Sequence, residues 1–244
     1  RAQSAQRVLQ EIEDIVHTHG LHKILFRDAV FTLHKDRVTA ICRGIIRKKI
    51  DVQWWCETRV DCLDQELVSL MKEAGCMGMN IGVETGDPDL MRTEAKVGLT
   101  VQKLERLCVH ARGIGLQLHF LLMIGLPHET PASVYKTYEL VARLKPASIG
   151  ICIVTPYPGT PLFEEASRKG WIETRDWTQY GGHSPVMHTD TLTSDDLAYV
   201  RDTIQRLFYA QRGGLRQRLF AFFERERFKA WAQGKAKRPA ERRS

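Results

Sequence analysis

The sequence predicts an α/β protein whose parallel strands form a barrel or a doubly wound sheet. Between about residue 8 and residue 155, five short apolar runs alternate with amphipathic helical segments. Each run is apolar enough to be covered on both faces, as strands of parallel sheets are. Beyond Pro161 the alternation is replaced by helices and a loop, so we expect helices to follow the sheet.

The predicted strands are short stretches rich in Ile, Leu, Val and Phe. They cover residues 24–26, 52–56, 79–83, 116–124 and 149–154. The helices between them are predicted from apolar residues that recur at helical spacing. They cover residues 8–16, 36–48, 64–74, 101–113 and 131–144, and are followed by helices at 162–169, 195–210 and 215–231.

Capping residues support these helix boundaries. Asp64, Thr100 and Thr130 stand where a side-chain oxygen can accept from the first free amides of a helix. Gly20 and Gly75 follow two predicted helices and can adopt the left-handed conformation that ends them. We therefore expect strands and helices to alternate regularly up to residue 170.

Charge and composition divide the chain further. The segment 201–244 holds 13 Lys and Arg against four Asp and Glu, a balance of +9, whereas the whole chain carries +7. We expect three parts: the barrel at 1–170, a loop and helical extension at 171–231, and a basic disordered tail at 232–244. A solvated basic end is the simpler interpretation of this tail, and a nucleic-acid-binding arm is the alternative.

The chain is 244 residues long and 43% hydrophobic, enough for a sizeable core. Its longest apolar run, residues 116–126, is interrupted by Gln117 and His119 and is too short to span a bilayer. The first residues do not resemble a signal peptide. We expect a cytoplasmic protein without a membrane span.

The six cysteines lack the spacing of a metal site. No two of them are three or four positions apart, so neither a zinc-type pair nor an iron–sulfur cluster motif is present. We expect buried, reduced thiols. The histidines at 17, 19 and 22 do not share a helix face, so a metal site is not expected there either.

Polar residues and glycines gather where the predicted strands end. In parallel α/β proteins, ligands bind beyond the carboxyl ends of the strands. Four of the five strand exits carry acidic residues, two carry arginines, and the last three carry glycines that allow close backbone approach. Together these exits predict a polar small-molecule site, although each alone could only cap a helix or form a turn.

The same five segments resemble motifs of radical S-adenosylmethionine enzymes, especially the branch that often carries a preceding cobalamin-binding domain. That branch shows F-x-D-D-x-F-T, W-x-C-x-x-R-x-D, G-x-E-S-G, G-x-P-x-E-T and T-P-Y-P-G-T in this order. The corresponding segments here are Phe26–Thr32, Trp54–Asp61, Gly82–Gly86, Gly125–Thr130 and Thr155–Thr160. The resemblance spans roughly residues 4–170.

The resemblance implies a partial (β/α)6 TIM-like barrel with the first βα unit missing, so that five of six strands are present, plus C-terminal helices. In the family, the loop after the first strand carries a CxxxCxxC motif that binds a 4Fe-4S cluster. This sequence has no such motif. By resemblance, the chain is a fragment of an enzyme whose cluster ligands lie upstream, and the chain alone is expected to be inactive. Catalytic residues and metal ligands within the chain cannot be named.

Family positions imply a set of residues that bind S-adenosylmethionine. Asp28 stands where the family contacts the methionyl amino group, although Ala29 replaces the usual second Asp. Arg59 is a candidate for the methionyl carboxylate, and an ion pair with Asp61 is the alternative. At the end of the next strand, Glu84 would contact the ribose hydroxyls or the methionyl end, and Thr85 keeps the hydroxyl of the family Ser.

Two later strand exits are implied to line the adenine. These contacts would be apolar or made by the backbone, and would come from Gly125 and Pro127 and from Val154 and Thr155. The implied cofactors are S-adenosylmethionine, the 4Fe-4S cluster and, in this branch, cobalamin. The implied partners are a small-molecule substrate and an electron donor such as flavodoxin or ferredoxin. We do not expect nucleic acid to be a partner.

The expected chemistry is reductive cleavage of S-adenosylmethionine to start radical chemistry, either methyl transfer or an oxidative rearrangement, on a substrate that the sequence does not identify. The alternative is a cluster-less, non-catalytic paralogue that binds a ligand or partner. An unrelated barrel enzyme of aldolase type is disfavoured, because no strand exit carries a lysine that could form a Schiff base.

Overall fold

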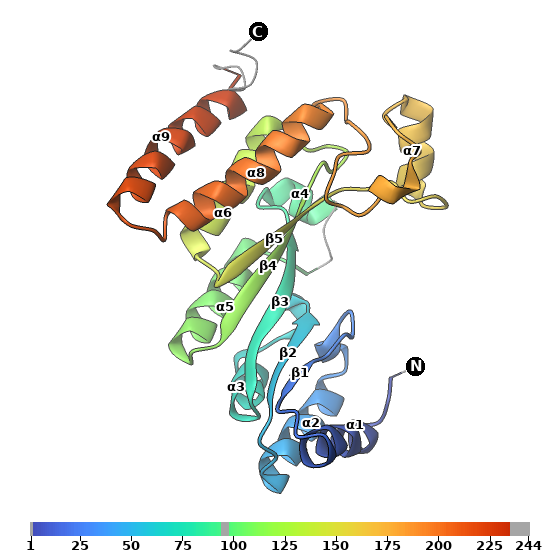
Figure 1. Cartoon of the computed structure of the whole chain (residues 1–244), viewed down its shortest axis with the longest axis vertical. Helices are drawn as coiled ribbons and strands as arrows, with labels where there is room; N and C mark the ends of the chain where they lie inside the picture. Colours follow the sequence, from blue (N-terminus) through green and yellow to red (C-terminus); the bar gives the residue numbers. More distant parts are fainter. Residues whose placement is uncertain (1, 94–97, 235–244) are drawn as a thin grey trace. The chain divides into compact units, whose positions relative to one another are not determined.

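The computed structural model of the chain describes residues 2–93 and 98–234 (Figure 1). The strands are β1 Lys23–Leu25, β2 Gln53–Thr58, β3 Cys76–Glu84, β4 Gln117–Ile124 and β5 Ser148–Ile153. The α-helices are α1 Ala5–Glu13, α2 Lys35–Lys48, α3 Gln65–Glu73, α4 Pro88–Thr93, α5 Val101–Gly113, α6 Pro131–Leu144, α7 Pro161–Lys169, α8 Ser194–Ala210 and α9 Leu215–Ala232. A π-helical turn, η1 Asp14–Thr18, continues α1, and short 3-10 turns occupy η2 Phe31–Leu33, η3 Val60–Cys62 and η4 Trp177–Gln179.

The five strands form one sheet in the order β1-β2-β3-β4-β5. They are parallel and belong to a half-barrel, and β1 pairs with β2 through Ile24 opposite Trp54. A register shift lies between Trp54 and Trp55 in β2. The predicted fold class, an α/β half-barrel of parallel strands followed by C-terminal helices, is confirmed.

The predicted caps form as expected. The Asp64 carboxylate accepts from the Leu67 amide at 2.8 Å, and the Thr100 hydroxyl accepts from Lys103 N. Thr130 and Ser133 form a reciprocal capping box at the start of α6. These local bonds explain why the sequence located these helix starts well.

Three features differ from the sequence prediction. Helix α4 was not predicted, because a single turn and a half shows no apolar repeat. Strand β3 begins at Cys76 instead of Met79, because Gly78 interrupts the apolar run that marked the strand. Cys152 is exposed, whereas Cys42, Cys56, Cys76 and Cys108 are buried and Cys62 is partly buried.

The chain divides into two compact units. Unit 1 comprises residues 1–82, 98–120 and 146–148, and unit 2 comprises residues 83–97, 121–145 and 149–244. The boundary predicted at residue 170 stays a prediction, since this division follows contacts and passes through the sheet. The tail predicted to be disordered lies mainly at residues 235–244, outside the described residues.

Each unit has its own core. In unit 1, α2 and α3 bury Val38, Ile41 and Leu67, and the α1–α2 and α2–α3 pairs lie side by side. In unit 2, α6, α8 and α9 pack together and bury Val134 and Ile204 (Figure 1).

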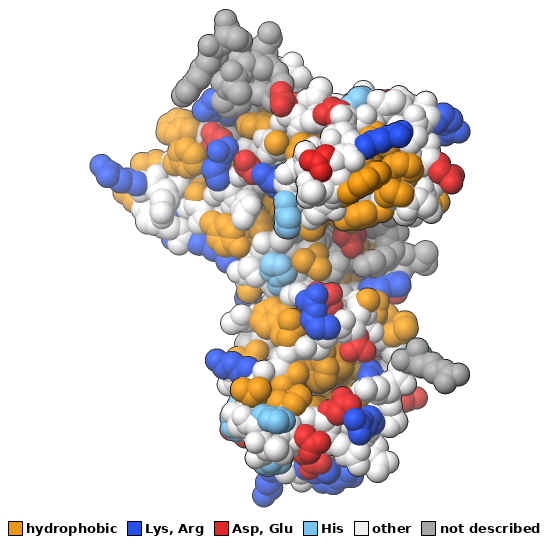
Figure 2. Space-filling view, turned by 45° about the vertical axis from the view of Figure 1, so that its right-hand side comes forward, with side chains coloured by type: hydrophobic (Ala, Val, Ile, Leu, Met, Phe, Trp, Pro, Cys, Tyr) orange, Lys and Arg blue, Asp and Glu red, His pale blue; other side chains and the backbone are white. Residues whose placement is uncertain are grey.

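Some hydrophobic side chains remain at the surface of both units (Figure 2). No helix within the described ranges combines the length and hydrophobicity needed to cross a membrane.

Candidate functional site

The eight predicted binding residues fall in both units. Asp28 and Arg59 belong to unit 1, at the exits of β1 and β2. The other six belong to unit 2, at the exits of β3, β4 and β5, and are Glu84, Thr85, Gly125, Pro127, Val154 and Thr155.

The turn after β1 is built by aromatic packing. The Phe26 and Phe31 rings stack with centroids 4.5 Å apart, and Phe26 meets Trp54 edge-on at 5.4 Å. The buried Thr32 hydroxyl contacts the hydroxyl of Thr58 at the end of β2. Most of the F-x-D-A-x-F-T motif is therefore used to fix the conformation of this exit.

Asp28 and Arg59 are the two predicted binding residues of this unit. The Asp28 side chain is 44% exposed and lies 4.0 Å from the guanidinium of Arg37. Arg59 makes a two-bond ion pair with Asp61, at 2.9 and 2.6 Å. The structural alternative for Arg59, an ion pair with Asp61, is therefore confirmed. Binding of a methionyl carboxylate by Arg59 stays a prediction.

Sequence reasoning missed a polar network on the sheet of unit 1. In β2 the buried residues alternate with half-buried Trp55 and Glu57, which therefore lie on the other face of the sheet. The Trp55 indole N–H donates to Asn80 Oδ1 at 2.7 Å, and Asn80 Nδ2 donates to Glu57 Oε1 at 3.3 Å. Arg27 lies 3.8 Å from Glu57. The alternation of polar residues within these strands was the signal that could have revealed this network.

His119 extends this polar face along β4. Its Nδ1 lies 2.6 Å from the Ser148 hydroxyl. Burial lowers the pKa of His119, and the nearby Glu57 carboxylate opposes that shift only in part. The ring is therefore kept neutral at pH 7, and Ser148 satisfies its Nδ1.

In unit 2, Glu84 ends β3 in a left-handed backbone conformation, with φ of 63°. A side chain in this region costs about 1 kcal/mol. The next amide, Thr85 N, donates back to Val83 O at 2.8 Å. The chain thus turns sharply at the position from which Glu84 was predicted to contact the ribose or methionyl end.

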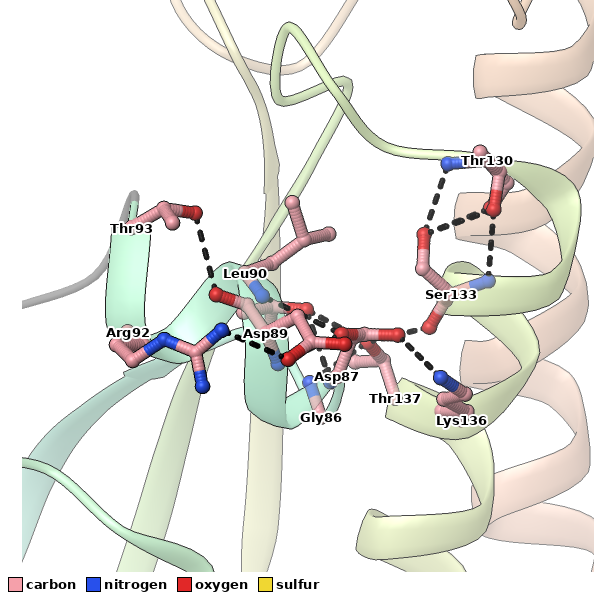
Figure 3. Close-up of polar contacts among 11 residues, drawn as sticks. Gly86, Asp87, Asp89, Leu90, Arg92, Thr93, Thr130, Ser133, Lys136 and Thr137 are labelled. Carbon is pink, nitrogen blue, oxygen red and sulfur yellow. Dashed lines mark hydrogen bonds and ion pairs between the residues drawn. The ribbon is translucent and has the colours of Figure 1, made fainter.

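Thr85 and Gly86 join this turn to helix α6, and Figure 3 shows the contact between Gly86 and Thr137. Thr85 is fully buried, and its hydroxyl lies 3.3 Å from the hydroxyl of Thr137 and accepts from Asp87 N. The Gly86 amide donates to Thr137 Oγ1 at 2.8 Å. The Thr85 hydroxyl therefore serves the fold, and its contact with a cofactor stays a prediction.

Asp87 holds the start of α4 and reaches α6 as well (Figure 3). Its Oδ1 accepts from the amides of Asp89 and Leu90, and its Oδ2 accepts from Lys136 Nζ at 2.6 Å. Burial favours the neutral carboxyl, but the Lys136 bond and the two amide bonds outweigh it, so the pKa of Asp87 is lowered. The turn after β3 is thus anchored by an ionised aspartate.

The turn after β4 is held by a buried glutamate. Gly125 has φ of 94°, and its amide donates to Glu129 Oε2 at 2.6 Å. The Glu129 amide donates in return to Leu126 O at 2.9 Å. Glu129 thereby closes the loop that contains Gly125 and Pro127, and it was not among the predicted site residues. Its position directly before the helix cap Thr130 was the available signal.

The second oxygen of Glu129 has no hydrogen-bond partner among the described residues. Burial raises the pKa of Glu129 to about 8, although the Gly125 and Leu126 amides act in the opposite direction, and the Asp87 carboxylate raises it further. At neutral pH this carboxyl is therefore largely protonated.

The turn after β5 continues from the end of β4. The Val154 amide donates to Ile124 O at 2.8 Å, and the Thr155 hydroxyl donates to Ile153 O at 3.1 Å. Ile153 N also donates to Gly182 O, so the segment after α7 is tied to β5. Unit 2 therefore brings the exits of β4 and β5 together through main-chain bonds.

Within the described ranges, no cluster of three or more His, Cys, Asp or Glu side chains could hold a metal ion. The buried thiols are also poorly suited to ligation. The neighbouring Cys76 thiol and burial raise the pKa of Cys56, and burial raises that of Cys42 to about 12. The described residues do not fit an iron–sulfur cluster.

Comparisons with known proteins identify the family. The chain matches the Radical SAM superfamily over residues 1–141, which is more than half of its length. It is 31% identical over 198 residues to an uncharacterized methyltransferase of Pyrococcus horikoshii, covering 81% of this chain and 43% of that protein. It is 26% identical over 202 residues to the anaerobic magnesium-protoporphyrin IX monomethyl ester cyclase of Rubrivivax gelatinosus, covering 81% and 35%.

A solved structure gives the same fold. The radical S-adenosylmethionine methyltransferase TsrM of Kitasatospora setae, determined with cobalamin and a 4Fe-4S cluster, superposes with a TM-score of 0.62. It is 22% identical, and the match covers 71% of this chain and 33% of that one. The chain thus spans less than half the length of these relatives. From the family match together with the ordered motifs at the strand exits, we conclude that this chain belongs to the Radical SAM superfamily.

Proposed function

We propose that this chain supplies the S-adenosylmethionine-binding strand exits of a radical enzyme that transfers a methyl group or rearranges its substrate oxidatively. The observation that carries this proposal is the pair of constrained turns in unit 2. One turn is strained at Glu84 and anchored by Asp87, and the other is closed by Glu129 around Gly125.

The two turns have the properties that a nucleoside site needs. The left-handed φ of Glu84 fixes the direction in which a carboxylate leaves the strand, and a carboxylate can accept from ribose hydroxyls. The loop at Gly125 and Pro127 presents backbone and apolar surface, to which an adenine can bind. Hydrogen bonds within the chain hold both turns without a ligand, which lowers the entropic cost of binding.

When bound and reduced, S-adenosylmethionine supplies a radical that abstracts hydrogen from a substrate. The residues of this chain would bind it, orient it and exclude water. Trp55, Glu57 and Asn80 add a polar surface on the sheet of unit 1 that a substrate could contact. The described residues do not fit an iron–sulfur cluster, so their role is confined to binding and orienting the ligand.

Methyl transfer is favoured by the names of the relatives. One is called a methyltransferase, and TsrM is a methyltransferase determined with cobalamin. The cyclase supports the oxidative alternative. On this basis we propose cobalamin as a further cofactor of the whole protein.

The proposal is tested by calorimetric titration of the chain with S-adenosylmethionine. We expect binding, and we expect Glu84→Gly to weaken it about tenfold or more, which is roughly 1.4 kcal/mol. Lys145→Gly is the matched control, because Lys145 also has a positive φ, of 50°, but ends α6. Both variants relieve backbone strain, so a loss of affinity confined to Glu84→Gly is due to the missing carboxylate and not to the changed backbone.

Two results would contradict the proposal. Absence of binding up to millimolar ligand would remove the binding function, and equal affinity of Glu84→Gly and wild type would remove the role of Glu84. A non-catalytic binding module is the second candidate, because the described residues do not fit an iron–sulfur cluster. A longer polypeptide containing this chain that forms 5′-deoxyadenosine from S-adenosylmethionine under reduction would exclude that candidate.

A further inference from the structure

The sheet of unit 1 has one apolar face and one polar face. On β2, Trp54 and Cys56 are buried, and the Trp54 indole donates to Ala74 O at the end of α3 at 2.7 Å, so this face packs against the helices. The opposite face carries Trp55 and Glu57, which are only half-buried. A parallel sheet normally has apolar contacts on both faces. A polar, partly exposed face is therefore a candidate binding surface.

Polar side chains form a row across four strands on this face. Glu57 on β2 is the register partner of Asn80 on β3, whose side-chain amide donates to it at 3.3 Å. His119 on β4 lies close enough for the Glu57 carboxylate to act on its ring, and its Nδ1 lies 2.6 Å from the hydroxyl of Ser148 on β5. All four side chains are partly exposed and belong to unit 1. Together with Trp55, these four residues form the polar face of unit 1.

Two atoms of the polar face are available to a ligand. Within residues 2–93 and 98–234, neither Glu57 Oε2 nor His119 Nε2 has a hydrogen-bond partner. Arg27 approaches only the other oxygen of Glu57, at 3.8 Å, and its side chain is 75% exposed, so this ion pair is weak. A carboxylate oxygen accepts hydrogen bonds and cannot donate them. The polar face therefore favours a ligand that donates hydrogen bonds and disfavours an anion.

Trp55 provides a flat surface beside this row. It is the register partner of Gly78, and a Cβ at Gly78 would lie 2.3 Å from both Cη2 and Cζ3 of the indole. The ring therefore lies over β3 in the space that a side chain would fill. Its N–H donates to Asn80 Oδ1 at 2.7 Å, which fixes the orientation of the ring. An indole held in this way stacks with planar groups and attracts cationic ones.

We propose that the polar face binds a planar, N–H-bearing group of the substrate, which stacks on Trp55 and donates to Glu57 Oε2. Trp55 and Glu57 are two residues apart on β2, about 6.6 Å along the strand, so a single ring with a nitrogen substituent spans both. His119 Nε2 offers a second polar contact. The substrate class is then a nitrogen-bearing aromatic or heterocyclic compound without an anionic group at this position. This assignment rests on the function proposed above, since it gives the ligand the role of substrate.

Three probes of one shape test this chemistry. Benzamidine, benzamide and benzoate share a planar ring, but the first is a cation with N–H donors, the second is a neutral donor, and the third is an anion without donors. In NMR titrations of the 244-residue chain, we expect benzamidine to bind with a dissociation constant of about 1 to 10 mM, benzamide more weakly, and benzoate at least about tenfold more weakly than benzamidine. The indole N–H signal of Trp55, identified by its loss in Trp55→Phe, should shift with benzamidine.

Substitutions separate the two contacts. Glu57→Gln should weaken benzamidine binding about fivefold or more and bring the affinities for benzamidine and benzoate within about threefold of each other, because the charge that separates them is removed. Gly78→Ala, whose Cβ displaces the indole, should weaken benzamidine and benzamide alike, about threefold or more. Circular dichroism melts verify that each variant is folded, and Trp55→Leu replaces Gly78→Ala if the latter unfolds.

Glu66→Gln on α3 is the matched control. Glu66 is exposed in the first turn of that helix, away from the polar face, so this variant should bind all three probes as wild type does. Three results would overturn the proposal: an unshifted Trp55 signal at about 50 mM benzamidine, equal affinities for benzamidine and benzoate, or a Glu57→Gln variant that binds benzamidine like wild type.

Titration with S-adenosylmethionine separates this inference from the function on which it rests. Glu57→Gln and Gly78→Ala should bind S-adenosylmethionine as wild type does, because the polar face lies outside the three strand exits of unit 2. A Glu57→Gln variant that loses both ligands would assign the polar face to S-adenosylmethionine and overturn the inference. A chain that binds benzamidine at Trp55 but does not bind S-adenosylmethionine would retain this binding site and overturn the proposed function instead.

Discussion

At the residue scale, the side chains that shape the proposed binding turns are mostly buried ones that the sequence did not single out. In the sequence Glu129 stands out only as one position of a motif. Its role in closing the Gly125 loop follows from the complete burial of its side chain, which the sequence does not show. The contact of Thr85 with Thr137 joins residues 52 positions apart, which no local pattern reveals. Arg59 could be paired with Asp61 in advance because the two are near neighbours in sequence.

Glu129 should make stability depend on pH. Its folded pKa of about 8 is above the ordinary 4.5, so the native state retains a proton that the unfolded state loses between these values. Stability from this group is full below about pH 4.5 and is lost as pH rises through 8. We expect Glu129→Gln, an amide that still accepts from Gly125 N, to be more stable than wild type at pH 8 by roughly 2 to 4 kcal/mol.

Urea unfolding between pH 5 and pH 8.5 measures this effect. The unfolding free energies of the two proteins should lie closest at pH 5 and should diverge progressively as the pH rises from there to 8. Parallel pH profiles of the two proteins would show that Glu129 is ionised in the native state.

Gly86 should not tolerate a side chain. A Cβ at this position would lie 2.5 Å from Thr137 Cα and 2.7 Å from Lys136 O, and both are backbone atoms that cannot move freely. Gly86→Ala should destabilise the chain by about 1–3 kcal/mol. Gly113→Ala is the control and should be neutral or mildly stabilising, because a Cβ at Gly113 would have no neighbouring atom within 4 Å. Equal thermal midpoints for the two variants would contradict the close packing of this turn.

At the element scale, the sequence predicted well those helices that have local end signals. Thr100 and Thr130 cap α5 and α6 as expected, and Gly20 has the left-handed φ of a chain that leaves a helix. Helix α4 was missed because its six residues show no apolar repeat, although Asp87 caps it locally and also accepts from Lys136 on α6. The sequence thus located the longer helices with an apolar repeat and missed the short one.

The start of α4 gives a graded test. Asp87→Ala removes both the cap and the Lys136 bond, whereas Lys136→Met removes only the ion pair. We expect a loss of about 1–2 kcal/mol for the first and under about 1 kcal/mol for the second, because Lys136 is half exposed.

Chemical unfolding of both variants checks the order. Asp87→Asn, which retains a capping oxygen, is the conservative control and should resemble Lys136→Met. A larger loss for Lys136→Met than for Asp87→Ala would show that the ion pair, and not the cap, holds α4.

At the scale of the whole molecule, the strand exits are supplied by this chain, whereas ligands for a cluster are not found among its described residues. The fold class was predictable because alternating apolar runs and helices restrict the topology. The substrate was not predictable for two reasons. The chain spans only 43% and 35% of the length of two relatives, and no motif in the sequence identifies the residues that select a substrate.

The chain alone should therefore not assemble a cluster. After anaerobic incubation with iron and sulfide and removal of excess reagent, we expect far less than one 4Fe-4S cluster per chain, since no CxxxCxxC is present. Iron and sulfide analysis gives the answer. Four irons and four sulfides per chain would show that cysteines of this chain rearrange into a ligand set.

The central claim, that the exits of β3, β4 and β5 bind S-adenosylmethionine, is tested most directly by hydrogen exchange with and without this ligand. We predict slower exchange at residues 83–87, 124–130 and 153–156, with no change in α9. Unchanged exchange in all three segments at saturating ligand, or protection confined to other parts of the chain, would contradict the claim.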